Sequence, residues 1–213
     1  MPCRGATLEA SLLLPATPRG LVLVAHGSGS SRLSPRNRQV ASALQQRGFG
    51  TLLVDLLTPA EAAEDERSGS LRFAIPLLGR RVAACVDWIA TQPSLAGLPL
   101  GLFGASTGAA AALTAAALRP RLVRAVVSRG GRPDLAPAAL PLVRCPVLLI
   151  VGERDREVLR LNRAAASALH GPRRLEVIPG AGHLFEEAGA LEAVAHGSAA
   201  WFGEHLIERV RAR

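Results

Sequence analysis

A serine with a glycine two residues before it and another two residues after it, Gly104-Ala105-Ser106-Thr107-Gly108, is the most specific chemical pattern in the sequence. The pattern is typical of a sharp turn from a strand into a helix. There the serine hydroxyl projects above a sheet, and the small residues let the chain pass itself closely. The neighbouring segments fit this turn, because apolar LPLGLF precedes it and AAAALTAAAL follows it. We therefore predict that Ser106 is a nucleophile.

A serine hydroxyl reacts well only when a base takes its proton and an acid orients that base. His183 is the candidate base, since it lies in the glycine-rich turn GAGH, five residues after the apolar run LEVI. Asp155 is the candidate acid, four residues after PVLLIV. Glu153 is the alternative acid. We favour Asp155 because Glu153 follows the predicted strand so closely that its longer side chain is expected to point away.

Such a serine also needs two backbone donors for the oxyanion of a tetrahedral intermediate. One is the N–H of Thr107, which directly follows the serine. The other is expected in the loop His26-Gly27-Ser28-Gly29-Ser30 after the run LVLVA, and we assign it to the N–H of Ser28. The same loop lacks the GK[ST] ending of a P-loop and the G-x-G-x-x-G spacing, which argues against phosphate cradling.

These residues must be positioned by a sheet, and the sequence alternates short apolar runs with helical patterns. Buried strands are predicted over residues 21–25, 51–55, 98–103, 122–127 and 146–151, with a sixth candidate strand over 175–178 and an antiparallel edge strand over 7–14. Helices are predicted from Ser34-Pro35 to about Arg47 and over 72–92, 107–118, 157–169 and 190–211. The polar stretch 58–70 is expected to be a solvated loop. The predicted fold is α/β with a mostly parallel central sheet and helices on both faces.

The amino-acid composition narrows the range of possible functions. The 213 residues fit one domain over 1–213, and 49% apolar against 20% charged residues is enough for a substantial core. The formal charge of +8 comes from arginine alone, since the chain has no lysine. The arginines are scattered and aromatic residues are only 3%, which argues against a nucleic-acid partner.

Cysteines and apolar segments bear on the compartment. Cys3, Cys85 and Cys145 are an odd number without framework spacing, which favours reduced thiols. The N-terminal apolar stretch is too short and interrupted for a signal sequence, and the longest small-apolar run, residues 108–118, is too short to span a membrane. We therefore expect a cytoplasmic protein without a membrane partner, and the sequence leaves its oligomeric state open.

The motifs HGSGS, GASTG, GERD and GAGHLF, in this order and each after an apolar strand, resemble the α/β-hydrolase superfamily over residues 20–190. The short length and the absence of an inserted lid resemble the dienelactone hydrolase-like branch of small bacterial esterases. The resemblance implies a three-layer fold without a cap domain and hydrolysis of a small-molecule carboxylic ester through an acyl-enzyme, with no cofactor and no metal. One position departs from the branch, because dienelactone hydrolases carry cysteine where this chain has Ser106.

Several alternatives stay open. The same triad would serve a thioesterase or an acyltransferase, and a non-catalytic binding module can keep the fold. Arg129 and Arg132 follow the strand predicted over 122–127 and could hold an anionic substrate group through bidentate contacts, or could be ordinary solvated loop arginines. A lidless site would be open and would favour small or flexible acyl groups.

Overall fold

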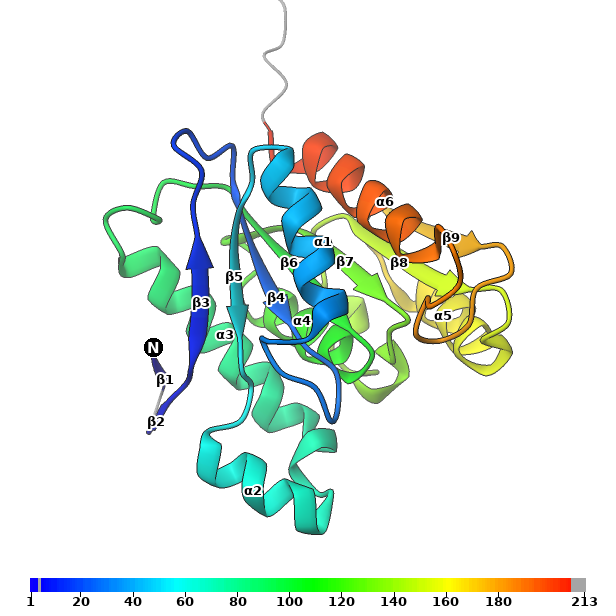
Figure 1. Ribbon diagram of the computed structural model, residues 1–213, viewed down its shortest axis with the longest axis horizontal. Helices are drawn as coiled ribbons and strands as arrows, with labels where there is room; N and C mark the ends of the chain where they lie inside the picture. The colour runs from blue at the N-terminus through cyan, green and yellow to red at the C-terminus, as the bar shows by residue number, and fades with distance from the viewer. Residues whose placement is uncertain (4, 208–213) are drawn as a thin grey trace, which may run out of the picture.

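Seven strands form the central sheet of the computed structural model, which describes residues 1–3 and 5–207. Their spatial order is β3-β5-β4-β6-β7-β8-β9 (Figure 1). Every neighbouring pair is parallel except β3 with β5. The strands are β3 (Ala10–Leu13), β4 (Leu21–Ala25), β5 (Gly50–Val54), β6 (Leu100–Ala105), β7 (Val123–Arg129), β8 (Val147–Gly152) and β9 (Arg173–Ile178), and a separate pair consists of β1 (Pro2–Cys3) and β2 (Ala6–Thr7). The predicted strands and the antiparallel edge are thus confirmed within a few residues.

Strand β4 lies inside the sheet, because its five apolar residues can be buried on both faces. It pairs with β5 on one side and with β6 on the other, so that Leu23 lies opposite both Leu52 and Leu102. The strand order therefore reverses at β4. In sheets of this type the crevice outside the carboxyl ends of the strands at the reversal is where ligands bind.

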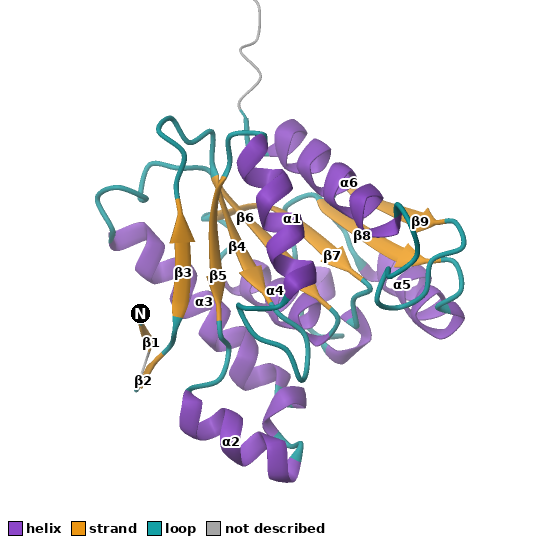
Figure 2. Ribbon diagram, in the orientation of Figure 1, coloured by secondary structure: helices purple, strands orange, loops and turns teal. Residues whose placement is uncertain are grey.

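Helices cover both faces of the sheet and make it the middle of three layers (Figure 2). One face carries α1 (Pro35–Gln46) and α6 (Ala190–His205), and the other carries α3 (Ile75–Thr91), α4 (Thr107–Leu118) and α5 (Arg156–Ala168). The predicted three-layer α/β-hydrolase fold is confirmed. The connection from β7 to β8 contains only two short 3-10 helices, Pro133–Leu135 and Leu140–Leu142, and no cap domain is evident in it.

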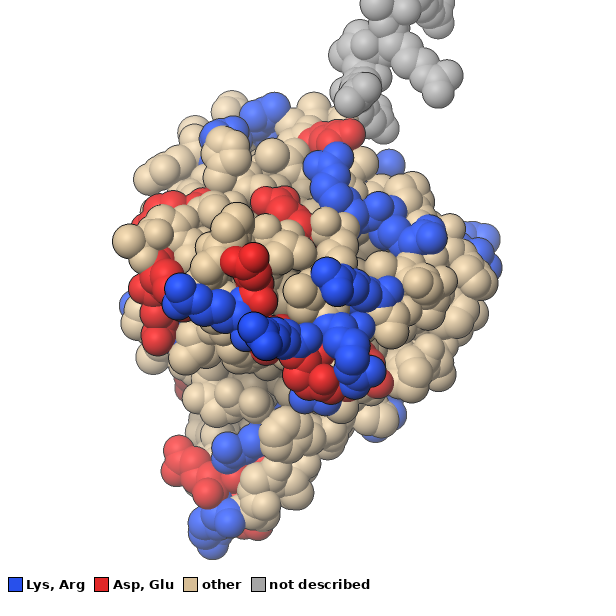
Figure 3. Space-filling model, turned by 90° about the vertical axis from the view of Figure 1, so that its right-hand side faces the viewer, with Lys and Arg blue, Asp and Glu red and all other residues tan. Residues whose placement is uncertain are grey.

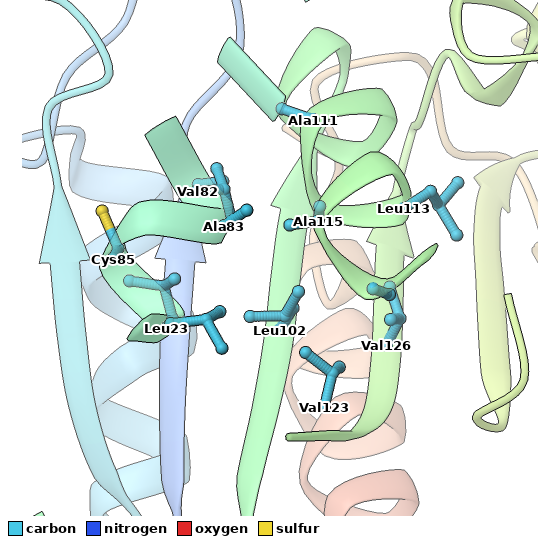
Figure 4. Close-up of a cluster of buried hydrophobic side chains, with 14 of the residues drawn as sticks. Leu23, Val82, Ala83, Cys85, Leu102, Ala111, Leu113, Ala115, Val123 and Val126 are labelled. Carbon is cyan, nitrogen blue, oxygen red and sulfur yellow. The ribbon is translucent and has the colours of Figure 1, made fainter. Parts of the chain in front are cut away.

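The core between the sheet and the helices α3 and α4 is built from small and branched side chains. Figure 4 shows Leu23 and Leu102 on the sheet beside Ala83 of α3 and Ala111 and Ala115 of α4. All five side chains are buried. The alanine-rich face of α4 lets this helix lie close to the strands, which positions the start of α4 beside the carboxyl ends of β4 and β6.

Two of the expected elements differ in the structure. The polar stretch 58–70 is not a loop, because it contains helix α2 (Pro59–Ser68). Thr58 caps this helix in a capping box with Glu61, and Gly69 ends it in the left-handed conformation. The sequence signal was therefore present as Thr-Pro-Ala-Glu. The last helix ends at His205, and residues 208–211 of the prediction lie outside the described residues.

Helix α2 projects from the body below the carboxyl ends of the strands (Figure 1) and is attached to it by polar contacts. Arg81 of α3 donates to both carboxylate oxygens of Glu61 at 2.7 and 2.6 Å and to the carbonyl of Leu56 at 2.8 Å. Buried Asp65 accepts from the backbone N–H groups of Leu71 and Arg72 and from the Arg72 side chain. These contacts hold the segment after β5 in place.

The ion pair between Glu61 and Arg81 gives a first prediction. Hydrogen bonds from Arg81 lower the pKa of Glu61 to about 2, so its contribution to stability is present above the usual carboxyl pKa and is lost as the pH falls toward 2. We expect Glu61→Gln to lower the free energy of unfolding by about 1–2 kcal/mol at pH 7 and by much less at pH 3. Urea unfolding at both pH values measures this. Glu64→Gln on the exposed side of α2 is the control, and an equal loss in both variants would contradict the assignment.

Candidate active site

Ser106 occupies a strained turn between β6 and α4. Its backbone has φ 49° and ψ −119°, a conformation that residues with a side chain rarely adopt. Two hydrogen bonds hold it, since its N–H donates to the carbonyl of Arg129 at 3.1 Å and its own carbonyl accepts from the N–H of Arg132 at 3.1 Å. Backbone strain maintained in this way is a mark of functional sites.

The two glycines of the pattern are required by close contacts. A Cβ atom on Gly104 would lie 2.4 Å from the Cα of Ala109, and one on Gly108 would lie 2.3 Å from the carbonyl oxygen of His26. Both distances are too short for any side chain. The Gly-x-Ser-x-Gly spacing is therefore explained by the crossing of the turn with helix α4 on one side and the end of β4 on the other.

Asp155 and His183 are brought together from the ends of β8 and β9. Asp155 precedes α5 directly, and its Oδ2 lies 2.5 Å from Nδ1 of His183. The Asp155 side chain is 14% exposed and that of His183 is 40% exposed. Glu153, the alternative acid, turns away and accepts a hydrogen bond from the N–H of Gly180 at 2.7 Å. The aspartate and not the glutamate contacts the histidine.

The turn that carries His183 is fixed by its own contacts and lies at the same edge as the serine. Glu187 accepts a hydrogen bond from the N–H of Gly182 at 2.9 Å, and Phe185 is buried with φ 56°. The Cε1 atom of His183 lies 3.6 Å from the position of a Cβ on Gly130. Gly130 directly follows the residue whose carbonyl holds the Ser106 N–H, so the histidine ring stands at the edge of the sheet where the serine turn lies.

The loop after β4 passes over the serine. A Cβ on Gly27 would lie 3.0 Å from the Cβ of Ser106. The side chain of His26 fixes the loop, because its Nδ1 lies 2.8 Å from the Gly27 carbonyl and its Nε2 accepts from the N–H of Leu56 at 3.0 Å. These partners require a neutral ring with the proton on Nδ1. Burial lowers the pKa of His26, in keeping with this form.

A cleft of about 900 Å³ opens beside this loop. It is lined by Ser28 and Thr107, the two residues expected to supply the oxyanion donors, and it extends between residues 26–36 and helix α2. Thr107 begins α4, and the first N–H groups of a helix have no acceptor within the helix. Ser106 directly precedes Thr107 of the cleft wall, and Ser106, Asp155 and His183 themselves are not among the lining residues.

Arg129 and Arg132 have different surroundings, since Arg129 ends β7 and is buried whereas Arg132 lies in the following loop and is partly exposed. Arg132 donates through Nε and Nη2 to both carboxylate oxygens of Asp134, at 2.9 and 2.7 Å. Arg129 is buried, with Nη2 3.5 Å from the Asn37 side-chain oxygen and its guanidinium 5.8 Å from the centre of the Phe185 ring. Asn37 and Phe185 were missed by the sequence analysis, although Asn37 follows the Ser34-Pro35 helix start.

One face of the molecule carries mixed charge. Figure 3 shows the face that includes β9 and α6, where basic and acidic side chains lie among one another. Within residues 1–3 and 5–207, no group of three or more histidine, cysteine, aspartate or glutamate residues is arranged to hold a metal ion. None of the helices in the same part of the chain is both long and apolar enough to cross a bilayer.

The arrangement joins a strained, hydrogen-bonded serine with a carboxylate–imidazole pair and a cleft bordered by a helix N-terminus. Solved structures share the fold of this chain. A crystal structure of dienelactone hydrolase from Anabaena variabilis is 55% identical, with a TM-score of 0.92 over 93% of this chain and 92% of that one. Est1E from Butyrivibrio proteoclasticus is 17% identical, with a TM-score of 0.78 over 95% and 96% of the two chains, and supports the fold alone.

This chain is also similar to part of a longer curated protein. A Mycobacterium tuberculosis protein, provisionally named a phosphoribosyl transferase, is 57% identical over 196 residues, which are 92% of this chain and 43% of that protein. The chain thus spans less than half the length of the curated relatives it matches. The model of the dienelactone hydrolase family matches residues 8–203. With this match and the 55% identity to a solved dienelactone hydrolase, the chain belongs to the dienelactone hydrolase family.

Proposed function

We propose that this member of a hydrolase family cleaves carboxylic esters of small molecules through an acyl-enzyme, with Ser106 as nucleophile, His183 as general base and acid, and Asp155 as the orienting acid. The observation that carries the proposal is the 2.5 Å contact between Asp155 Oδ2 and His183 Nδ1, at the same edge of the sheet as the strained Ser106 turn. A carboxylate that is hydrogen-bonded to one imidazole nitrogen leaves the other nitrogen free to accept the serine proton.

The reaction follows from these positions. Nε2 of His183 accepts the Ser106 proton as the serine oxygen attacks the ester carbonyl, and Asp155 stabilises the imidazolium that forms. The imidazolium then gives its proton to the departing alkoxide, which leaves an acyl group on Ser106. A water molecule, activated by the same nitrogen, attacks this acyl group and releases the acid. Thioester cleavage and acyl transfer use the same acyl-enzyme and differ only in the leaving or accepting group.

The negative oxygen of each tetrahedral intermediate would be held by the N–H groups of Thr107 and Ser28. Both residues line the cleft, and Gly27 lies against the Cβ of Ser106, which brings the following N–H close to the reacting atoms. His26 is a positioning residue in this scheme, because its two hydrogen bonds tie the loop to the backbone at Gly27 and Leu56. Preorganised donors of this kind commonly contribute the largest electrostatic share of catalysis.

The name of the Mycobacterium tuberculosis relatives does not carry over directly. The dienelactone hydrolase model accounts for residues 8–203 of this chain, and the relatives are more than twice as long as the matched segment. We assign the transferase name to the part of those proteins outside the match. Ester hydrolysis is therefore the function that the residues of this chain support.

Replacement of the nucleophile tests the proposal directly. Ser106→Ala should reduce turnover of a p-nitrophenyl ester by roughly 10⁴-fold or more, because the acyl-enzyme can no longer form. Its melting temperature should stay close to that of the wild type. A fluorophosphonate probe should label the wild type and leave the variant unlabelled. Ser128→Ala, at the end of β7, is the matched serine control, and substantial turnover by Ser106→Ala would refute the assignment.

The two acids are distinguished by a matched pair of substitutions. Asp155→Asn keeps the size and loses the charge that stabilises the imidazolium, so turnover should fall by about 10³–10⁴-fold. Glu153→Gln should be nearly normal, since an amide oxygen can still accept the hydrogen bond from Gly180. Steady-state kinetics at neutral pH measure both. The reverse pattern would move the acid to Glu153 in spite of the geometry.

The pH dependence of the free energy of unfolding tests whether His26 holds the loop as a neutral ring. Because burial lowers the pKa of His26 below its ordinary value of 6.5, the folded state favours the neutral ring. Its contribution is fully present above about pH 6.5 and is lost as the pH falls below that value. His26→Ala should cost about 1–3 kcal/mol at pH 8, since it leaves the Leu56 N–H without its partner.

The loss of unfolding free energy caused by His26→Ala should be smaller at pH 5 than at pH 7. Ester turnover by the variant should also fall, because the loop after β4 is no longer held in place. Denaturant unfolding at several pH values and ester kinetics measure these two effects. His196→Ala, on the exposed side of α6, is the control. A cost that stays constant across this pH range would show that the ring is not held in its neutral form.

A further inference from the structure

Asn162 is a fully buried amide in the middle of α5. Its Nδ2 donates one hydrogen bond to the carbonyl oxygen of Gly131 at 2.9 Å and another to that of Val158 at 2.8 Å. Both partners are acceptors, so they fix which side of the amide carries the NH₂ group. The bond to Val158 stays within the helix, whereas the bond to Gly131 joins α5 to the loop that follows β7.

The oxygen of this amide is not satisfied in the same way. Within residues 1–3 and 5–207, the buried Oδ1 of Asn162 has no hydrogen-bond partner. A buried acceptor without a partner costs free energy, and an apolar side chain would avoid that cost. The other buried residues of α5 are indeed apolar: Val158, Leu159 and Ala165. The bond from Nδ2 to Gly131 is therefore the feature that an apolar residue at this position could not supply.

The loop held by this amide contacts the proposed nucleophile on two sides. The carbonyl of Arg129 accepts from the N–H of Ser106, and the N–H of Arg132 donates to the carbonyl of Ser106, both at 3.1 Å. Gly131 lies between these two contacts. It packs closely against α4, since a Cβ atom on it would lie 2.7 Å from the Cβ of Ala109. A shift of this loop would therefore be passed on to the backbone of the serine.

Helix α5 carries the proposed acid at its N-terminus. Asp155 is the N-cap residue, and its backbone carbonyl accepts a hydrogen bond from the N–H of Leu159 at 2.8 Å. The carboxylate of the same residue contacts His183. Asn162 lies about two turns further along the helix. One helix thus bears both the acid and the amide that holds the loop beside the serine.

We propose that Asn162 is a positioning residue, which joins α5 to the loop after β7 and so sets the place of Ser106 relative to the acid and the base. This role rests on the proposed serine mechanism. Asn162 acts through Gly131 and does not itself take part in proton transfer or bond formation. Turnover depends steeply on such geometry, since a displacement of about 1 Å can reduce it by roughly 100-fold.

Removal of the amide tests this role. Asn162→Ala should lower kcat for a p-nitrophenyl ester by about tenfold or more and change KM by less than about threefold, because the chemical step and not substrate binding depends on the loop. The rate at which a fluorophosphonate labels Ser106 should fall to a similar extent. Both rates are measured well below the melting temperature of the variant, where it is folded. Ser198→Ala removes a buried hydrogen bond to the Val194 carbonyl within α6, and this control should change neither rate.

A conservative replacement separates the hydrogen bond from packing. Asn162→Asp keeps the shape of the side chain, and its carboxyl group can donate to the Gly131 carbonyl only when it is protonated. Burial raises the pKa of a carboxyl group, so the donor is present at mildly acidic pH and is lost at alkaline pH. We therefore expect the ratio of the variant's kcat to that of the wild type to rise as the pH falls from about 8 to about 6. The same ratio for Asn162→Ala should stay constant.

Three results would overturn the positioning role: a normal kcat in Asn162→Ala, an equal loss of kcat in Ser198→Ala, or a kcat ratio of Asn162→Asp that does not change with pH. The last of these stands even if Asn162→Ala does not fold. Ser106→Ala, measured in parallel, separates this role from the proposed function. If Ser106→Ala is inactive and Asn162→Ala is normal, only the positioning role fails. If Ser106→Ala keeps its turnover, the serine mechanism itself fails.

Discussion

The close passage of three chain segments at Ser106 is the constraint on which the site depends. Neither Gly104 nor Gly108 has room for a Cβ atom, because helix α4 presses on one and the end of β4 presses on the other. Hydrogen bonds to the neighbouring strand end hold the serine from the remaining side. A change in the spacing of β4, β6 and β7 would therefore alter the serine, the loop above it and the connection beside it together. The apolar packing of Leu23, Leu102 and the alanines of α4 fixes that spacing (Figure 4).

Much of this architecture could be predicted because it is encoded locally. The short runs LVLVA and PVLLIV are apolar at every position, as expected of strands covered on both faces, and both form buried strands. The contact between Asp155 and His183 followed from the order of strand ends along the sheet. Helix α2 was missed because polarity was weighed above the capping pattern around Thr58, and the capping box decides the conformation of this short segment.

Contacts between distant residues could not be predicted in the same way. Nothing in the sequence around Arg129 indicates that its side chain turns toward Asn37 of α1, because that contact depends on the crossing of a helix and a strand. Arg132 is the opposite case, since its partner Asp134 is only two residues away. His26 was interpreted through the glycines that follow it, and its role in holding the loop depends on Leu56, which lies after the next strand.

Helix α2, which forms one wall of the cleft, is attached to the body differently from the segments that carry the proposed catalytic residues. This helix borders the cleft, yet its ties to the body are ion pairs and hydrogen bonds through Arg81 and Asp65. The core clusters do not include its side chains. Segments held in this way open locally at a lower free energy than the sheet. Evolution can therefore exchange the residues of α2, and with them the molecules admitted to the cleft, while the strands and the serine turn keep their geometry.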